Sequence, residues 1–355
     1  MKILITGNMG YVGPGVVSHL RKCYPNAELI GYDTGYFANS LTNSVFLPEV
    51  KLTKQVFGDV RNFDPSLFEG VDAIVYLAAI SNDPMGNLFE EVTMDINYRA
   101  AIKMAKAGRE RGVKSFVFAS SCSVYGLADE HAKVETDTLN PLTAYARSKI
   151  AAETDLEPLA GKDFTVTCLR FATACGFSNR LRLDLVINDF VAGAVTSKKI
   201  DILSDGTPWR PLINVLDMAR AIEWAIERTP ETGGDFLAVN TGSSEWNYQV
   251  KELADSVAEI VHGCKVSVNP DAPPDKRSYR VNFDLFKRLA PDHQPKFDLK
   301  STVIALVENL NQMDFNDADF RKSSLIRLNV IKQLKADGYL DNDLFWTSKQ
   351  NINLL

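Results

Sequence analysis

The sequence lacks the features of several large classes of protein. Its 355 residues contain no run of about 18 apolar residues, so no transmembrane span is expected. The chain starts with Met1 and Lys2 and runs directly into an apolar strand and a glycine-rich turn, which is unlike a signal peptide. The 39 Lys and Arg residues are outnumbered by 45 Asp and Glu, and the net charge of -6 does not suit a nucleic-acid-binding surface. We therefore expect neither a membrane nor a nucleic acid as partner.

Cysteine and histidine are also scarce. The four histidines show no ligand spacing, so no metal site is expected. An odd number of scattered cysteines favours reduced thiols in a cytoplasmic protein over a disulfide framework. The cysteines, none of them in a C-x-x-C pair, are Cys23, Cys122, Cys168, Cys175 and Cys264.

Short apolar segments alternate with helical segments through the first half of the chain. The apolar segments are bounded by Gly, Pro or Asp, as expected for strands that are buried on both faces. This alternation predicts an α/β fold with a Rossmann-type, doubly wound parallel sheet. The expected strands are residues 2–6, 28–33, 54–58, 73–77, 115–120 and 165–171, and the expected helices are 13–23, 88–111 and 143–159.

The pattern changes after residue 175, where strand signals become sparse. Further helices are expected at 183–196, 215–228 and 248–261, and the prolines of 269–280 predict an irregular segment. We expect a Rossmann domain over residues 1–175, to which later segments can return. A smaller C-terminal substrate-binding lobe over 176–300 and a helical C-terminal extension over 301–355 complete the expected organisation.

A glycine-rich turn follows the first strand directly. Gly7 permits the tight turn, Gly10 lets the backbone approach a pyrophosphate, and Gly13 lets the following helix pack closely on the strand. Tyr11 and Val12 lie at the start of that helix, whose free N–H groups face the phosphates. This motif, between a strand and a helix, predicts a dinucleotide-binding domain.

The second expected strand ends at Asp33. A carboxylate there accepts hydrogen bonds from the adenosine ribose 2′-hydroxyl and repels a 2′-phosphate. No Arg or Lys occurs within residues 34–38, so NAD is favoured over NADP. Asp59 and Val60 follow the third strand, where Asp59 either holds the adenine amino group or is an ordinary turn aspartate.

A candidate catalytic group follows the fifth strand. Tyr145 and Lys149 are four residues apart at the start of an expected helix, so they lie on one face of it. A lysine cation beside the phenol, together with the positive charge of an oxidised nicotinamide, is expected to lower the pKa of Tyr145 so that it can act as a base. The hydroxyl of Ser121 or Ser123 can hold the substrate oxygen while the phenolate takes its proton.

These motifs together resemble the extended short-chain dehydrogenase/reductase family, in its nucleotide-sugar epimerase and dehydratase group. The motifs are T-G-x-x-G-x-x-G, the acidic end of the second strand, L-A-A, S-S-x-S-V-Y-G and Y-x-x-x-K, and the resemblance covers about residues 1–290. It implies that Ser121, Tyr145 and Lys149 are catalytic, that Tyr145 and Lys149 also contact the cofactor, and that Asn97 has a structural role. It also implies that Leu77, Ala78 and Ala79 line the cofactor cleft.

The resemblance extends to the substrate side. Thr173 stands where the family often has an asparagine that contacts the substrate, and Ser123 resembles the small hydroxyl residue of 4-epimerases. Arg210 is implied to pair with the substrate diphosphate, for which a planar guanidinium is suited. Arg277 is implied to be a second phosphate or ribose contact, with a solvated loop charge as the alternative.

The resemblance also limits the reaction. Enzymes of this group begin by removing a proton from a sugar hydroxyl, here taken as that at C4, while a hydride passes to NAD. Dehydratases carry an Asp-Glu pair after the catalytic Ser or Thr, and this chain has Cys122 and Ser123 there, so dehydration is disfavoured. Cys122 lies one position before the cysteine of some epimerases and is expected to serve packing.

The sequence thus predicts an NAD-dependent nucleotide-sugar epimerase, and three alternatives stay open. They are a nucleotide-sugar dehydrogenase or ketoreductase with net redox chemistry, a non-catalytic dinucleotide-sensing module, and an NAD-dependent reductase that acts on something other than a nucleotide sugar. The family resemblance further implies a homodimer, formed by pairing helices 88–111 and 143–159 of two copies into a four-helix bundle.

Overall fold

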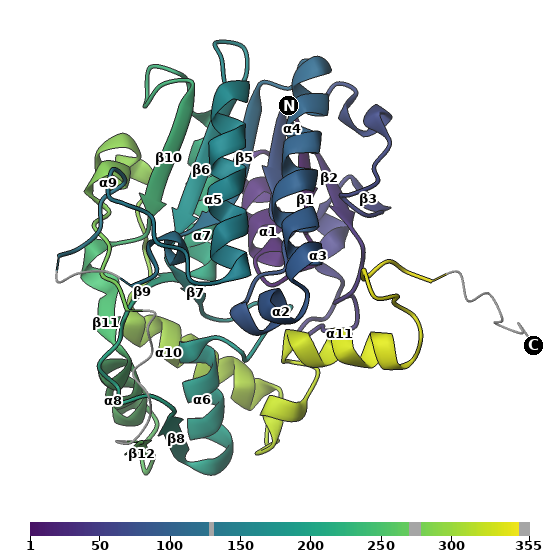
Figure 1. Cartoon of the computed structure of the whole chain (residues 1–355). Coiled ribbons are helices and arrows are strands. Elements are labelled where there is room, and N and C mark those ends of the chain that lie inside the picture. The colour runs from purple at the N-terminus through teal and green to yellow at the C-terminus, as the bar shows by residue number, and fades with distance from the viewer. Residues whose placement is uncertain (128–130, 270–277, 348–355) are drawn as a thin grey trace, which may run out of the picture.

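A seven-stranded parallel sheet forms the centre of the molecule, in the order β10-β6-β5-β4-β1-β2-β3 (Figure 1). The computed structural model describes residues 1–127, 131–269 and 278–347. All six expected strands are present, each within one residue of its predicted bounds, and the α/β, doubly wound arrangement is confirmed. The strands are β1 (Lys2–Thr6), β2 (Glu28–Asp33), β3 (Lys54–Phe57), β4 (Ala73–Tyr76), β5 (Ser115–Ser121), β6 (Thr165–Phe171) and β10 (Phe236–Thr241).

The seventh strand, β10, was not expected from the sequence, where strand signals are weak after residue 175. It pairs in parallel with β6 over its whole length. Before it, α7 (Val215–Glu227) packs against α1 (Gly13–Cys23) and covers one face of β5 and β6. The chain therefore returns to the Rossmann sheet after it has entered the second lobe.

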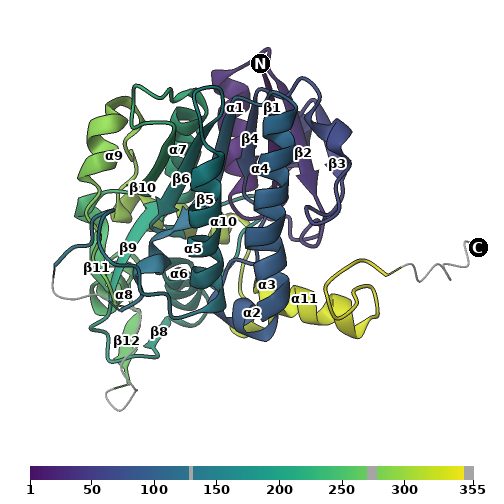
Figure 2. The same ribbon diagram turned by 45° about the horizontal axis from the view of Figure 1, so that its top comes forward.

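The opposite face of the sheet carries α4 (Ala100–Glu110) and α5 (Ala144–Leu156), which lie side by side in both views (Figures 1 and 2). Strands β4, β5 and β6 are almost wholly buried between the two helical layers, and most of their side chains are apolar. Each face of the sheet thus has its own apolar core.

The single helix expected over 88–111 is wrong in detail. The chain forms α2 (Asp83–Leu88), α3 (Glu90–Met94), one π-helical turn at Asp95–Arg99 and then α4. The widened turn carries the buried Asn97, whose side-chain amide accepts from the backbone N–H of Ile80 at 2.9 Å and donates to its carbonyl at 3.0 Å. Such turns commonly occur where a helix must present a particular side chain.

The second lobe lies at the carboxyl end of the sheet. Its core is formed by three helices, and α10 packs on α6 and α8. Two small sheets complete the lobe, in the orders β11-β9-β7 and β12-β8. The elements are α6 (Val186–Ser197), α8 (Val250–Ile260), α10 (Leu299–Gln312), β7 (Thr173–Cys175), β8 (Lys199–Ile202), β9 (Trp209–Asn214), β11 (Asn247–Gln249) and β12 (Lys265–Val268).

The remaining helices are α9 (Asp284–Leu289), which packs on β10, and α11 (Arg327–Ala336). Figure 1 shows α11 in yellow below the β1–β3 edge of the sheet, next to α2. Among the described residues, no helix is both long and apolar enough to cross a membrane.

A buried network of polar side chains fastens α5 to the sheet. Arg170 of β6 pairs with Glu153 of α5 at 2.7 Å, and Ser120 of β5 donates to the same carboxylate at 2.5 Å. Arg170 also donates to the hydroxyl of Tyr125, which donates in turn to Asn240 of β10. Three strands and one helix therefore share a single hydrogen-bonded cluster.

We predict that Glu153→Gln destabilises the protein strongly. Loss of one partner from a buried ion pair leaves an uncompensated charge, here that of Arg170, and costs about 3–5 kcal/mol. The free energy of unfolding is to be measured by urea denaturation. The exposed pair of Lys251 and Asp255 provides the control, because Asp255→Asn is expected to cost less than about 1 kcal/mol. An equal loss in the two variants would contradict the assigned role of Glu153.

Candidate active site

A cavity of about 1010 Å³ opens at the carboxyl ends of the strands, between the sheet and the second lobe. In parallel α/β sheets, ligands bind at this edge. Of the residues expected to form the site, Gly13 does not line the cavity and Arg277 lies outside the described residues. All the others do line it: Gly7, Gly10, Tyr11, Val12, Asp33, Asp59, Val60, Leu77, Ala78, Ala79, Ser121, Ser123, Tyr145, Lys149, Thr173 and Arg210.

The glycine turn has the close packing that its sequence predicts. Gly7 has a φ of +70°, and a Cβ there would lie 2.6 Å from the backbone nitrogen of Ala78. At Gly13, a Cβ would lie 1.9 Å from the carbonyl oxygen of Asn8, so only glycine lets α1 approach the turn. The start of α1 and the open side of the turn face the cavity through Gly10 and Val12. This cradle fits the pyrophosphate of a dinucleotide.

Asp33 holds the loop after β2 and also lines the cavity. Its carboxylate accepts from the backbone N–H groups of Met9 at 2.9 Å and Gly35 at 2.7 Å. Burial raises the pKa of Asp33 above its ordinary value, and the two backbone hydrogen bonds act in the opposite direction. A carboxylate accepts about four hydrogen bonds, so the two used here leave acceptor capacity for a ribose hydroxyl.

Asp59 is engaged within the protein. Its carboxylate accepts from Arg61 Nη2 at 2.6 Å, from Arg61 Nε at 2.9 Å and from the Arg61 backbone N–H at 2.8 Å. Any contact between Asp59 and adenine is therefore shared with this arginine.

The candidate catalytic residues come from β5 and α5. Thr143 caps α5 by accepting from the backbone N–H of Ala146, so the helix begins just before Tyr145. Lys149, one turn later, places Nζ 5.5 Å from the centroid of the Tyr145 ring and donates to the carbonyl of Ala119 at 2.6 Å. Ser121 ends β5 and accepts from the backbone N–H of Ser123 at 3.1 Å.

Burial dominates the protonation states of Tyr145 and Lys149 in the protein without cofactor. Burial raises the pKa of Tyr145 to about 12, although a hydrogen bond with Ser121 acts to lower it. Burial also lowers the pKa of Lys149 to about 7. The expectation that the lysine cation and an oxidised nicotinamide together lower the pKa of the phenol concerns the cofactor-bound protein and stays a prediction. Desolvation of both groups dominates, and the remaining source of positive charge for a phenolate is an oxidised nicotinamide.

The substrate side of the cavity contains an unsatisfied hydroxyl. Ser123 Oγ is buried and has no hydrogen-bond partner among the described residues, although Ser123 lines the cavity. Such a group costs free energy unless a ligand completes its hydrogen bonds. Cys122 faces the core, where its thiol donates to the carbonyl of Arg170 at 3.0 Å, which agrees with the expected packing role.

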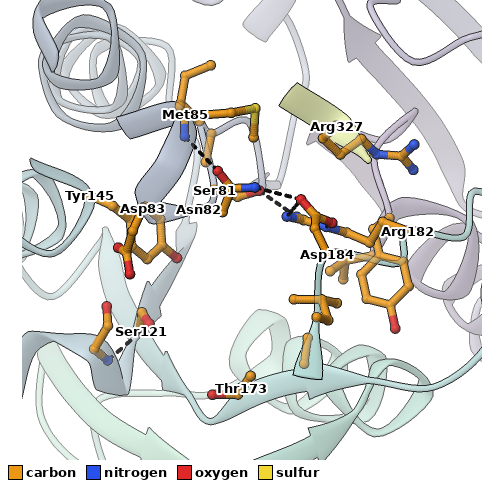
Figure 3. A pocket seen from close by; sticks show the side chains of 18 of the residues that line it. Ser81, Asn82, Asp83, Met85, Ser121, Tyr145, Thr173, Arg182, Asp184 and Arg327 are labelled. Carbon is orange, nitrogen blue, oxygen red and sulfur yellow. Dashed lines mark hydrogen bonds and ion pairs between the residues drawn. The ribbon is translucent and has the colours of Figure 1, made fainter. Parts of the chain in front are cut away.

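One group of polar residues in the cavity is not predicted by any motif in the sequence. Arg182 makes two hydrogen bonds to Asp184, at 2.7 and 2.8 Å, and donates to Ser81, while Asn82 donates to Asp184 at 2.6 Å (Figure 3). Burial opposes ionisation of Asp184, but Arg182 outweighs it and holds the pKa of Asp184 below its ordinary value. The only signal in the sequence is the alternation R-L-R-L-D at residues 180–184, where charged residues interrupt an apolar pattern.

Asn97 connects two parts of the site by buried hydrogen bonds. Besides holding Ile80, its side chain donates to the hydroxyl of Ser148 on α5 at 3.1 Å. The loop that carries Ser81 and the helix that carries Tyr145 are therefore held by one buried amide, and the expected structural role of Asn97 is confirmed.

Comparison with curated proteins gives several relatives. The chain is 31% identical over 279 residues to YtcB of Bacillus subtilis, described as an uncharacterized UDP-glucose epimerase, with 76% of this chain and 84% of that protein covered. It is 28% identical to the UDP-glucose 4-epimerase of Rhizobium meliloti, over 73% of this chain and 81% of that protein.

Solved structures show the same fold. MoeE5 in complex with UDP-glucose and NAD has a TM-score of 0.72 at 24% identity, over 88% of this chain and 99% of that one. The UDP-glucose-4-epimerase of Stenotrophomonas maltophila has a TM-score of 0.74 at 21% identity, with the same coverage. The model of the NAD dependent epimerase/dehydratase family matches residues 3–240. With the dinucleotide cradle and the Y-x-x-x-K helix at one cavity, the chain belongs to the NAD-dependent epimerase/dehydratase family, and its cofactor is NAD.

Proposed function

We propose that this protein is a nucleotide-sugar epimerase. It oxidises the hydroxyl at C4 of the sugar by transfer of a hydride to NAD, and then returns the hydride to the keto intermediate. The observation that carries this proposal is the position of Tyr145 and Ser121 in the cavity that the glycine cradle also faces. Relatives described as UDP-glucose 4-epimerases support the same reaction. NAD, when bound, supplies the acceptor and later the donor of the hydride.

In this proposal Tyr145 takes the proton of the substrate hydroxyl and returns it in the second half-reaction. Ser121 holds the reacting oxygen, because its hydroxyl is hydrogen-bonded to the side chain of Tyr145 and therefore lies where the substrate hydroxyl must sit. Lys149 lies one helical turn after Tyr145, and its ammonium group is near the phenol ring. In this position it is proposed to bind the ribose of the cofactor. Lys149 is only 2% exposed, whereas Tyr145 is partly exposed toward the cavity, where a substrate hydroxyl can reach it.

The substrate is proposed to contact Ser123, Thr173, Arg210 and Arg277. The unsatisfied Ser123 hydroxyl suits a sugar hydroxyl, and the Arg210 guanidinium suits a diphosphate. Dehydration lacks support, because the positions after Ser121 hold a core-facing thiol and a neutral hydroxyl instead of an acid pair.

We also propose a cytoplasmic homodimer. Helices α4 and α5 lie side by side on one face of the sheet, where a second copy can add its own pair to make a four-helix bundle (Figure 2).

Tyr145→Phe is predicted to reduce the epimerisation rate about 10²- to 10⁴-fold, which is the usual contribution of a positioned acid or base. NAD binding is expected to remain, because the ring keeps its place. The measurement is interconversion of UDP-glucose and UDP-galactose, with NAD quantified after denaturation of the protein. Tyr24→Phe is the control, since that hydroxyl donates to Glu227 at 2.6 Å at an exposed site away from the cavity. A wild-type protein that binds NAD but turns over no nucleotide sugar would contradict the epimerase function.

Lys149→Met is predicted to change how stability depends on pH. The pKa of Lys149 falls from 10.5 when unfolded to about 7 in the folded protein. Between these values the unfolded chain binds the proton that the folded protein has lost, so the free energy of unfolding rises with pH by up to about 1.4 kcal/mol per unit. Urea denaturation from pH 6.5 to 9.5 should show a shallower rise in the variant than in the wild type. Parallel curves would mean that Lys149 is not neutralised by burial.

A further inference from the structure

The C-terminal segment of residues 339–347 packs against the loops that follow β2 and β3. Trp346 Nε1 donates to the carbonyl of Thr34 at 2.8 Å, and its ring lies 5.6 Å from that of Tyr36. The guanidinium of Arg61 lies 3.6 Å from the centroid of Phe345. Thr34 and Tyr36 in the first loop and Asp59 in the second line the cavity, so the segment packs on loops that border the side where the adenosine half of a dinucleotide is expected.

Helix α11 brings a buried cation to the same cavity. Arg327 is 2% exposed and lines the cavity together with Arg182, beside which it appears in Figure 3. Its Nη2 donates to the carbonyl of Arg180 at 2.5 Å, and its guanidinium lies 4.7 Å from the ring of Phe37. Its Nη1 is buried and has no hydrogen-bond partner among the described residues.

This arrangement is unfavourable without an anion. Burial lowers the pKa of Arg327, and the nearby Arg182 acts in the same direction. The closest carboxylate, Asp184, is already held by both nitrogens of the Arg182 fork and by Asn82. A guanidinium with an unused donor in a polar cavity is a ready partner for a phosphate oxygen.

We propose that α11 and residues 339–347 complete the dinucleotide site, with Arg327 binding the diphosphate of NAD and the Trp346–Tyr36 and Phe345–Arg61 contacts holding its adenosine side closed. This inference rests on the proposed function. Arg327 lies against Phe37, in the loop after β2, and near Tyr11, in the glycine turn before α1. Both neighbours belong to the expected NAD site, so the position of Arg327 favours the diphosphate of the cofactor over that of a substrate. The contacts of the segment then stiffen these loops and slow the release of NAD, which favours retention of the cofactor between half-reactions.

The test uses the full-length chain and two variants. Arg327→Gln removes the charge and is expected to weaken binding of NAD about tenfold or more, as for a lost charge-assisted hydrogen bond, with recovery in Arg327→Lys. Trp346→Ala is expected to raise the rate of NAD dissociation about fivefold or more by loss of the closing contact. Calorimetry gives the Kd of NAD and, separately, of UDP, and stopped-flow fluorescence gives the dissociation rate.

Tyr339→Ala is the matched control, because Tyr339 is a 54% exposed aromatic residue of the same segment, compared with 46% for Trp346. Equal NAD binding by wild type and both variants overturns the inference. A loss of UDP binding alone in Arg327→Gln also overturns it, because the arginine then serves the substrate. If Arg327→Gln does not fold, the Trp346→Ala variant provides the test, because Trp346 is exposed. An unchanged rate of NAD dissociation in Trp346→Ala overturns the proposed role of the C-terminal segment. Wild-type protein that binds no NAD contradicts the proposed function instead.

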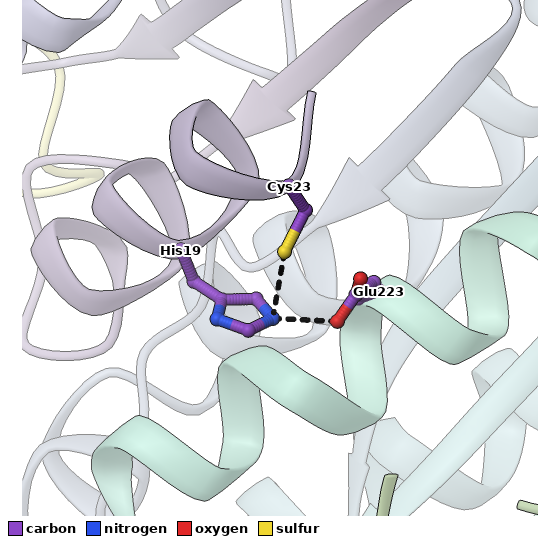
Figure 4. A group of neighbouring side chains, drawn as sticks. All are labelled: His19, Cys23 and Glu223. Atoms are coloured by element: carbon purple, nitrogen blue, oxygen red, sulfur yellow. Dashed lines mark hydrogen bonds and ion pairs between the residues drawn. The ribbon is translucent and has the colours of Figure 1, made fainter. Parts of the chain in front are cut away.

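A separate group of potential metal ligands lies where α1 packs on α7. His19 and Cys23 are one turn apart on α1 and face Glu223 of α7 (Figure 4). His19 Nε2 lies 2.7 Å from Glu223 Oε2 and 3.6 Å from Cys23 Sγ, and His293 Nε2 lies 3.6 Å from the same carboxylate oxygen. All four residues line one surface pocket.

We infer a cation site here that takes Zn²⁺ or a similar ion. Bonds of about 2.0 Å to nitrogen and oxygen and 2.3 Å to sulfur place tetrahedral ligand atoms about 3.3–3.6 Å apart. The separations of Cys23 from His19 and of His293 from Glu223 match this range. The shorter distance, between His19 and Glu223, is that of a hydrogen bond, which a bound ion would replace. One thiolate and one carboxylate balance the charge of a divalent ion. The sequence suggested no metal site because the ligands come from three distant segments.

Titration of the metal-free protein with Co²⁺ alone tests this inference. The expected result is a near-ultraviolet thiolate-to-cobalt absorption band with one ion bound per chain, displaced by Zn²⁺. Cys23→Ser should abolish the band, whereas Cys264→Ser, which changes another partly exposed thiol, should keep it. No band in the wild type, or an unchanged band in Cys23→Ser, overturns the site.

Discussion

The buried ion pair of Glu153 and Arg170 is the interaction on which the geometry of the site depends. Glu153 lies one turn beyond Lys149 on α5, so the pair fixes the rotation of the helix that presents the candidate base. The desolvation cost of the two charges is offset by hydrogen bonds from Ser120 and to Tyr125. A hydrophobic contact could hold the helix equally close, but it would not fix the direction in which Tyr145 points.

The same constraint explains the unusual protonation states. The packing of α5 against the sheet places Tyr145 and Lys149 in a largely desolvated position, which raises the cost of charging either one. The protein without ligand therefore stores its base in the neutral form. A positively charged nicotinamide bound beside Tyr145 would favour its phenolate. In the proposed reaction, burial would thus couple proton removal to binding of the oxidised cofactor.

Local features were predictable from the sequence, and long-range ones were not. The strands up to β6, the glycine turn and the spacing of Tyr145 and Lys149 follow from short patterns whose physics is contained within about ten residues. β10 was missed because its six residues form a short apolar run with no motif, and only its pairing with β6 identifies it. Arg182 and Arg327 were missed because each resembles a surface charge until the chain brings it to the cavity.

The pKa of Tyr145 in the protein without cofactor is another property that sequence spacing alone does not give. Sequence spacing gives the distance between a lysine and a phenol, but the cost of burial depends on everything that surrounds them. The sequence likewise gives no measure of how the turn at 95–99 widens to carry Asn97, since the amide is satisfied by a loop 17 residues earlier. Both cases concern what a side chain contacts in space.

The return of the chain to the sheet through α7 and β10 has a consequence for how the protein was assembled in evolution. β9 belongs to the second lobe, yet the next two elements rebuild the edge and one face of the first. The two lobes are therefore interleaved along the gene, and neither can be exchanged by a simple fusion at one boundary. New substrate preferences are more accessible through changes within the loops and short strands of the second lobe than through replacement of the lobe as a unit.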